Sequence, residues 1–165
     1  MKFKVQQDEL IHALSLVTTS VERRGTLPIL GNLMLKLDGD KLHVTGTDLE
    51  VETTASIRVE VIEVGSVTVP AKKLFDIVRA LPSDNTITFS FANSDKAVVT
   101  SGRGRYTLQT LNAKDFPSID DFKETHSFPV STESFARLLT ATVFSMAVND
   151  VRYFLNGVLL HIDGG

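Results

Sequence analysis

The chain repeats its own opening after 125 residues, without a gap, as far as its last residues. The matches include Phe3-Lys-Val5 with Phe128-Pro-Val130, Leu14 with Leu139, Pro28-Ile-Leu30 with Tyr153-Phe-Leu155, and Leu33-Met-Leu35 with Val158-Leu-Leu160. A repeat of fixed period guides architecture more strongly than local propensity, because each period is one structural unit. We therefore expect a complete first domain over residues 1–125 and the truncated start of a second, similar domain over residues 126–165.

Composition excludes several classes of protein. The net charge of −3 argues against a polycation that coats nucleic acid, although a local basic face remains compatible with it. The absence of cysteine excludes a disulfide framework, a thiol nucleophile and a thiolate metal site. The N-terminal segment becomes polar after too few residues to contain the apolar stretch of a signal peptide. No apolar segment reaches the length of a membrane span. We expect a soluble, cytoplasmic protein without a membrane partner.

Hydrophobic periodicity predicts an α+β fold. Helices are expected over residues 8–20, capped by Asp8, over 71–81, opened by Pro70, and over 132–146. Period-two patterns predict strands over residues 2–6, 33–37, 42–44, 49–54, 57–59, 67–69, 86–91, 96–100 and 104–111. Two helices cannot cover both faces of so many strands, so we expect them on one face of a curved antiparallel sheet. Residues 112–127 are expected to form a linker.

The third helix is expected to begin the second domain. Its buried stripe is predicted to consist of Phe135, Leu138, Leu139 and Thr142.

An acidic run has two interpretations. Asp48, Glu50 and Glu52 alternate, which would place three carboxylates on one face of a strand. They could hold Mg²⁺. The plainer interpretation, which we favour, is a solvated strand face with Leu49 and Val51 buried opposite.

Segment Ser101-Gly-Arg-Gly-Arg105 could bind an anion, but no helix pattern follows it, so a hairpin with arginines at a sheet edge is favoured. Those arginines could serve a protein interface. The four histidines match no ligand spacing, and no serine lies in a nucleophile motif. We therefore predict no catalytic residue, metal site or cofactor.

Basic and aromatic residues suggest a phosphate-contacting surface. Lys72 and Arg79 share a face of the second helix, and Lys73 flanks it. The repeat aligns Arg24, in the loop after the first helix, with Asn149, in the loop that continues to Tyr153 and Phe154. Such donors suit phosphate oxygens, and aromatic rings can stack on bases. The spacing of these residues is equally compatible with helix faces and loops that are simply exposed to solvent and bind no partner.

Six motifs together carry a family resemblance. They are Leu27-Pro-Ile-Leu-Gly-Asn32, Thr45-Gly-Thr-Asp-Leu-Glu50, Val69-Pro-Ala71, Asp115-Phe-Pro117, Phe144-Ser-Met-Ala147 and Asp150-Val-Arg-Tyr153. In this order they resemble the bacterial sliding clamp, the beta subunit of DNA polymerase III. The resemblance covers essentially the whole chain.

The resemblance implies a DNA-clamp fold of tandem repeated domains, three per chain, of which the third would be absent here. Two full-length chains would form a head-to-tail homodimeric ring around double-stranded DNA, with helices lining the hole. The function implied is a noncatalytic processivity factor of a DNA-directed DNA polymerase holoenzyme. Implied partners are the DNA polymerase III catalytic subunit, the clamp loader, and other clamp-binding polymerases and repair proteins.

The resemblance also assigns roles by position. It implies DNA contacts at Arg24, Lys72, Asn149, Tyr153 and Phe154, a dimer interface at Lys73, Arg103, Arg105 and Tyr106, and a partner-peptide pocket edged by Arg152 and Leu155. Three positions depart from the family pattern, which has arginine at 72, often glutamine at 149 and often tyrosine at 154. Lysine at 72 keeps the charge without the planar fork of arginine.

Two other hypotheses stay open. One is a protein-interaction scaffold of tandem α+β domains that never touches DNA, in keeping with the acidic net charge. The other is a metal-dependent enzyme built on Asp48, Glu50 and Glu52.

Overall fold

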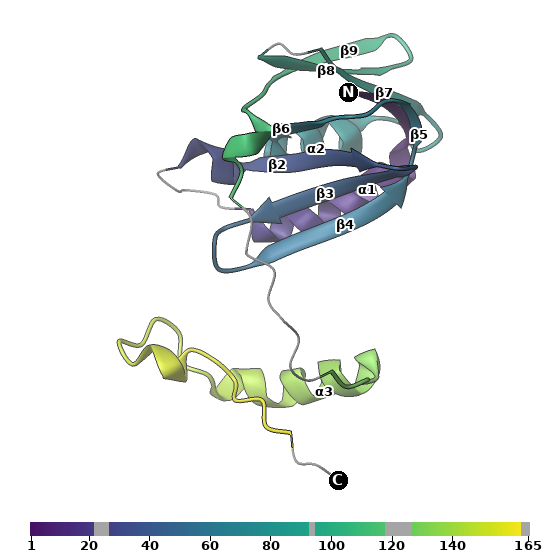
Figure 1. Cartoon of the computed structure of the whole chain (residues 1–165). Helices are drawn as coiled ribbons and strands as arrows, with labels where there is room; N and C mark the ends of the chain where they lie inside the picture. Colours follow the sequence, from purple (N-terminus) through teal and green to yellow (C-terminus); the bar gives the residue numbers. More distant parts are fainter. Residues whose placement is uncertain (22–26, 93–94, 118–126, 163–165) are drawn as a thin grey trace. The chain divides into compact units, whose positions relative to one another are not determined.

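The computed structural model describes residues 1–21, 27–92, 95–117 and 127–162. The chain separates into two compact units, Met1–Asp120 and Asp121–Gly165. The first unit holds all the strands of the described residues, whereas the described part of the second unit is helical or irregular (Figure 1). The two units are therefore described one after the other.

The strands of the first unit form two antiparallel sheets. The five-stranded sheet has the order β5 (Glu60–Glu63), β1 (Lys2–Gln6), β7 (Thr86–Phe91), β8 (Lys96–Ser101) and β9 (Gly104–Gln109). The four-stranded sheet has the order β4 (Glu52–Arg58), β3 (Lys41–Thr47), β2 (Asn32–Asp38) and β6 (Ser66–Pro70). Val59 alone separates β4 from β5, so the chain passes directly from one sheet to the other.

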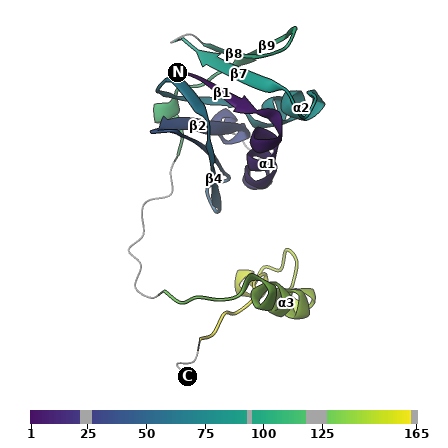
Figure 2. The same cartoon turned by 90° about the vertical axis from the view of Figure 1, so that its right-hand side faces the viewer.

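Two helices cover one face of the four-stranded sheet. Helix α1 (Gln7–Val17), continued by a 3₁₀ turn η1 (Thr18–Ser20), packs against β3 and β4. Helix α2 (Ala71–Ala80) packs against β2 and β6, and the two helices contact each other (Figures 1 and 2). The α+β class and the antiparallel pairing are confirmed. The strands form two sheets instead of the single curved sheet that was expected, and β4 and β5, which Val59 alone separates, belong to different sheets.

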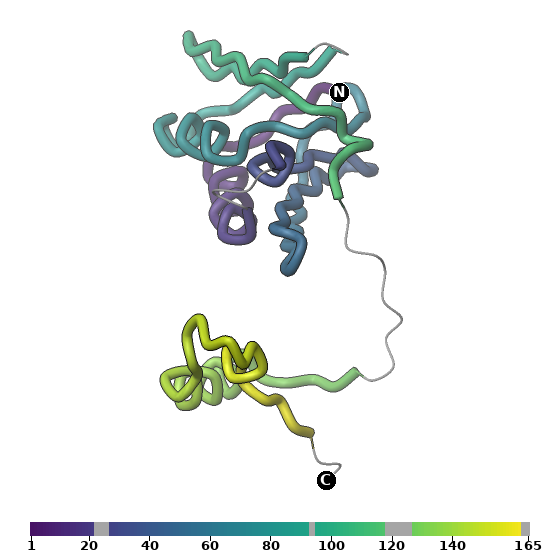
Figure 3. The backbone as a smooth tube through the Cα atoms, turned by 90° about the vertical axis from the view of Figure 1, so that its left-hand side faces the viewer, coloured from purple at the N-terminus to yellow at the C-terminus, as the bar shows by residue number. Residues whose placement is uncertain are grey.

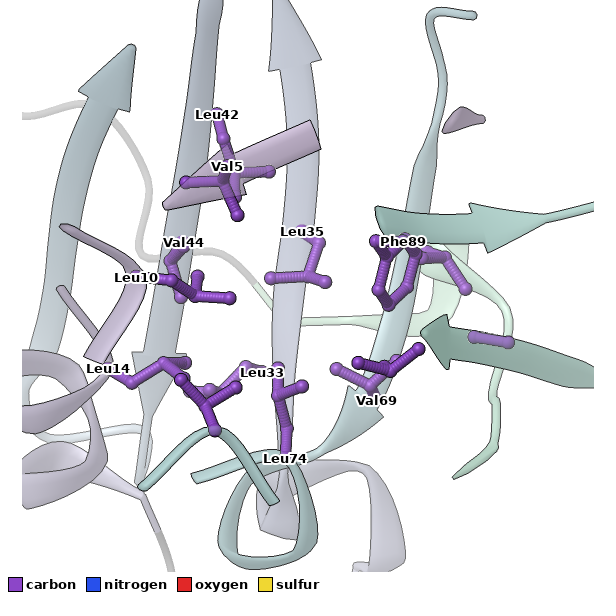
Figure 4. Close-up of a cluster of buried hydrophobic side chains, with 14 of the residues drawn as sticks. Val5, Leu10, Leu14, Leu33, Leu35, Leu42, Val44, Val69, Leu74 and Phe89 are labelled. Atoms are coloured by element: carbon purple, nitrogen blue, oxygen red, sulfur yellow. The ribbon is translucent and has the colours of Figure 1, made fainter. Parts of the chain in front are cut away.

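The core of the first unit fills the space between α1, α2 and the strands. Leu33 and Leu35 on β2 and Val44 on β3 are fully buried, as period-two alternation requires (Figure 4). Leu14 on α1 and Leu74 on α2 meet this face and are also buried. Burying a leucine side chain of this kind stabilises a fold by roughly 1.5–3 kcal/mol.

The start of α1 differs from the expectation. Asp8 does not cap the helix. The capping position is Gln6, the last residue of β1, and its side chain makes no capping bond. The strand runs into the helix without a connecting residue, so no position remains for a capping loop. Gln7 instead anchors this junction, because its buried side chain donates a 2.8 Å hydrogen bond to the carbonyl of Val78 near the end of α2.

The strands predicted over residues 49–54 and 57–59 are one strand, β4, which begins only at Glu52. Pro70 ends β6 and stands at the capping position of α2, which begins at Ala71 as predicted.

The second unit reproduces the helical part of the first at the offset of the repeat. Helix α3 (Thr132–Thr142) and the 3₁₀ turn η4 (Val143–Ser145) align residue for residue with α1 and η1. Figure 3 follows the backbone through both units by colour. The 3₁₀ turn η5 (Tyr153–Leu155) aligns with the first three residues of η2 (Pro28–Gly31). Residues 127–131 and 157–162, which align with β1 and β2, form no strand.

The predicted buried stripe on α3 is wrong in the described part of the chain. No residue of α3 is buried, and Leu138 and Leu139 are 57% and 37% exposed. The reason is physical. A helix closes its own hydrogen bonds, whereas burial of its apolar face needs a packed sheet, and residues 127–162 contain no strand. Among the described residues, no helix combines the length and apolar character needed to cross a membrane.

Candidate nucleic-acid interface

Helix α2 presents lysines to solvent. Lys72 and Lys73 are exposed in its first turn, and neither has an ion-pair partner among the described residues. Arg79, predicted on the same face as Lys72, donates to Asp76 at 3.2 Å and lies over the ring of Phe75. The charge of Arg79 is therefore partly neutralised within the helix, whereas Lys72 and Lys73 are available to an external anion.

Lys72 also lines a surface depression of about 540 Å³ between the end of α1 and the start of α2. Its other walls come from Thr18, Val21, Gly31, Ala71, Phe75 and Asp76. Arg24, predicted to contact DNA from the adjoining loop, lies outside the described residues.

The second predicted contact segment forms a folded loop in the second unit. Asn149 has a φ of 58°, in the left-handed region that asparagine tolerates better than most residues. Tyr153 and Phe154 are 83% and 70% exposed, with their ring centroids 6.2 Å apart in an edge-to-face arrangement. The structure thus brings Asn149, Tyr153 and Phe154 into one loop and leaves both rings accessible.

Arg152 lies in the same loop and is held by Asp150. Its Nε and Nη2 atoms donate to the two carboxylate oxygens of Asp150, each at 3.0 Å, which is a bidentate pair. Hydrogen bonds from the side chain and then the backbone of Arg152 lower the pKa of Asp150, and the same carboxylate raises the pKa of Arg152. Leu155, its predicted neighbour at a partner pocket, is 37% exposed.

Three of the four residues predicted at a dimer interface lie on the edge strand β9 or in the turn before it. Arg103 is in the two-residue turn between β8 and β9, where Gly102 has a φ of 55°. The favoured hairpin is therefore confirmed, since Ser101 pairs with Gly104 across this turn. Strand β9 is an edge strand, with Arg105 exposed and Tyr106 half-buried. Because α2 packs against β9, Lys73 lies on a neighbouring element.

The acidic run has a different structure from either interpretation of it. Asp48 and Glu50 lie in the loop before β4, and only Glu52 belongs to the strand. The carboxylate of Asp48 accepts hydrogen bonds from the backbone of Val51 at 2.8 Å and Glu50 at 3.0 Å, and these bonds lower the pKa of Asp48. Leu49 and Val51, predicted to be buried, are each 52% exposed. A tight loop replaces the expected strand because Asp48 ties it closed.

The four histidines are scattered in sequence, and in the described ranges no three His, Asp or Glu side chains gather closely enough to hold a metal ion. His43 instead shares a 2.8 Å hydrogen bond with Ser56 across the pair of strands β3 and β4.

Sequence reasoning missed Asn156. Its side chain makes two hydrogen bonds, both of 3.0 Å, to the backbone N–H and carbonyl of Asp150. The sequence did contain a signal, because an Asn-Gly pair at residues 156–157 marks a turn and the repeat aligns Asn156 with a glycine, Gly31.

The chain matches known proteins along its length. Residues 1–120 match the family described as DNA polymerase III beta subunit, N-terminal domain. The chain is 44% identical over 166 residues to the beta sliding clamp of Pseudomonas aeruginosa, which covers 100% of this chain and 45% of that protein. It is 44% identical over 165 residues to the beta sliding clamp of Vibrio cholerae, with 99% and 45% covered.

Solved structures agree. The crystal structure of a sliding clamp (DNA polymerase III subunit beta) from Pseudomonas aeruginosa bound to griselimycin matches with a TM-score of 0.94 and 44% identity, covering 100% of this chain and 45% of that chain. The DNA polymerase sliding clamp of Caulobacter crescentus matches with a TM-score of 0.91 and 36% identity, covering 95% and 43%. The chain spans less than half the length of the curated relatives it matches. From the match over residues 1–120 and these likenesses, the chain belongs to the DNA polymerase III beta subunit family.

Proposed function

We propose that the complete gene product is a DNA sliding clamp, a ring-forming processivity factor that encircles duplex DNA and tethers the replicative polymerase. The observation that carries this proposal is the likeness of the whole chain to proteins named beta sliding clamp. The clamp performs no bond chemistry of its own. It replaces dissociation of the polymerase by sliding, and its place is the cytoplasm, with the replicating chromosome.

In this proposal residues 1–125 are the first clamp domain and residues 126–165 begin the second, while a third domain lies outside these residues. The repeat at 125 residues supports a tandem plan, and so does the equivalence of α1 and η1 with α3 and η4. The exposed apolar side chains of α3 are then a face that the remainder of the second domain covers.

Sliding needs an attraction to DNA that is weak and independent of sequence. Lysine and arginine contacts to phosphate supply it, because they respond to charge and read no base. We assign Arg24 and Lys72 to this role in the first domain, and Asn149, Tyr153 and Phe154 in the second. The exposed, unpaired ammonium group of Lys72 supports its assignment. Phe154 has no hydroxyl group, so it can contact DNA only by stacking or apolar contact.

The edge of β9 is the proposed dimer interface. An edge strand has one row of unpaired backbone groups that a strand of another chain can complete. Lys73, Arg103, Arg105 and Tyr106 would meet the third domain of the second chain head to tail. Arg103 and Arg105 have no acidic partner among the described residues, which leaves both charges available to that chain.

Arg152 and Leu155 are proposed to edge the pocket that takes peptides of the DNA polymerase III catalytic subunit, the clamp loader, and other clamp-binding polymerases and repair proteins. The partly exposed side chain of Leu155 offers an apolar contact. The guanidinium group of Arg152, three residues earlier in the chain, is held in place by Asp150.

A salt titration tests the DNA assignment. The complete gene product is titrated against two duplexes of unrelated sequence between about 50 and 200 mM salt. Equal affinity for both duplexes and a linear fall of log affinity with log salt are expected. Lys72→Gln should make the slope of log affinity against log salt shallower by about 0.9, the value for one phosphate contact.

The matched control is Lys36→Gln. Lys36 is exposed on β2 and carries the same charge, but its side chain is on the face of the sheet opposite to the buried Leu35 and Leu37. An unchanged slope is expected for this variant. Equal effects of the two variants would refute the helix-face assignment, and absence of binding at every salt concentration would favour the interaction scaffold.

A further inference from the structure

One side chain closes the loop that runs from Asn149 to Asn156. The Oδ1 atom of Asn156 accepts from the backbone N–H of Asp150, and its Nδ2 atom donates to the carbonyl of the same residue, both at 3.0 Å. A side-chain amide can do both at once, since its NH₂ group donates and its carbonyl oxygen accepts. The segment from Asp150 to Asn156 is thereby closed into a hydrogen-bonded ring.

Asp150 in turn holds Arg152, in the middle of the loop. Its carboxylate accepts the backbone N–H of Arg152 at 2.8 Å and both guanidinium bonds from the same residue. The backbone then turns through hydrogen bonds from Leu155 to Arg152, at 2.8 Å, and from Asn156 to Tyr153, at 3.0 Å. Asn156, Asp150 and Arg152 thus form a continuous clasp.

The clasp matters because packing does little to hold the residues that the loop presents. Tyr153 and Phe154 are 83% and 70% exposed and contact each other only edge to face. Asn149, immediately before Asp150, is in a left-handed conformation that needs support from its surroundings. The direction of these three side chains therefore depends on the backbone that the clasp fixes.

The clasp belongs to the second repeat alone. The offset of 125 residues aligns Asp150 with Gly25, Arg152 with Leu27 and Asn156 with Gly31. None of the three residues in the first copy has a side chain that can make these hydrogen bonds. The conserved period of the helices therefore does not explain the clasp, which is an addition to the second loop.

We propose that Asn156 is a positioning residue for DNA contact, which fixes the presentation of Asn149, Tyr153 and Phe154 by closing the loop on Asp150. This inference rests on the proposed function. It predicts that removing the amide weakens DNA binding without changing its salt dependence, because Asn156 has no charge and both its polar groups are bonded to Asp150.

The test uses Asn156→Ala in the complete gene product. Two quantities are measured: hydrogen exchange of the Asp150 amide without DNA, and DNA affinity as a function of salt. We expect exchange to accelerate at least tenfold and affinity to fall about tenfold, with an unchanged salt slope and melting temperature. Asn156→Gln keeps both polar groups one methylene further out, so a smaller loss is expected. It also replaces the alanine variant if that variant does not fold.

Asn112→Ala is the matched control. The Asn112 side chain also accepts a backbone hydrogen bond, from Lys114 at 3.0 Å, but it belongs to the first unit and not to the loop from Asn149 to Asn156. It should leave DNA affinity unchanged. Unaltered exchange at Asp150, or faster exchange with wild-type affinity, would overturn the proposal. If the wild-type protein itself does not bind DNA, the proposed function fails, whereas the exchange measurement still reports whether the clasp forms.

Discussion

Leu14 and Leu139 occupy the same position of the repeat but have different surroundings. Leu14, on α1, is fully buried between the helix and the sheet. Leu139, on α3, is 37% exposed, and no residue of that helix is buried. Leu14→Ala should therefore destabilise the 165-residue chain by about 3–4 kcal/mol, because it removes transfer energy and leaves a cavity. Leu139→Ala should cost less than about 1 kcal/mol, because it creates no cavity.

Urea unfolding measures both effects. The chain has two tyrosines, Tyr106 in the first unit and Tyr153 in the second, so a Tyr153→Phe background makes tyrosine fluorescence a reporter of the first unit. With a urea dependence of about 1.5–2 kcal/mol/M, Leu14→Ala should lower the midpoint by about 2 M. The same urea unfolding followed by far-ultraviolet circular dichroism also reports the helix of the second unit, and there Leu139→Ala should shift the midpoint far less than Leu14→Ala.

Equal midpoint shifts for the two variants would refute this reasoning, since they would mean that the two helices are packed to the same degree. A Leu14→Ala shift below about 0.5 M would show that the core described around α1 does not form.

Three further predictions concern single side chains. Arg24→Ala in the complete gene product should lower DNA affinity evenly across sequences and make the slope of log affinity against log salt shallower by about 0.9. Fluorescence titrations at several salt concentrations measure both. Arg152→Gln should raise the pKa of Asp150 toward its ordinary value, measured by NMR titration. The stabilisation from this pair is present above the unfolded-state pKa and is lost as pH falls through the depressed folded-state pKa. Thr68→Val should destabilise the first unit by about 1–3 kcal/mol in urea unfolding, because the buried Thr68 hydroxyl bonds both Asn32 and Leu111.

The sequence predicted helices better than it predicted their burial. Helices α1 and α3 have the same bounds once the offset of 125 residues is applied. This agreement is expected because the hydrogen bonds of a helix join residues of the same segment. The strands behave differently. β2 exists between β3 and β6, whereas residues 157–162 align with β2 but have no partner strands. The residues of a strand can indicate it, but the strand forms only where neighbouring strands pair with it.

The candidate site was predictable in its residue types but not in its local geometry. Alternation at Asp48, Glu50 and Glu52 indicated a strand, yet side-chain bonds from Asp48 close a loop there. Such competition between a short polar side chain and the sheet depends on local backbone geometry that periodicity does not contain. Asn156 was missed for the same reason, since its two bonds reach six residues back along the chain.

Release from circular DNA tests the central claim most directly. The complete gene product is loaded by its clamp loader onto nicked circular DNA, washed at a salt concentration that breaks ordinary phosphate contacts, and the DNA is then cut once. A topological ring should remain on the circles through the wash and leave rapidly after the cut, because only the free ends allow it to slide off. Equal retention on circular and linear DNA, or loss from both in the wash, would contradict the proposal that this chain is part of a sliding clamp.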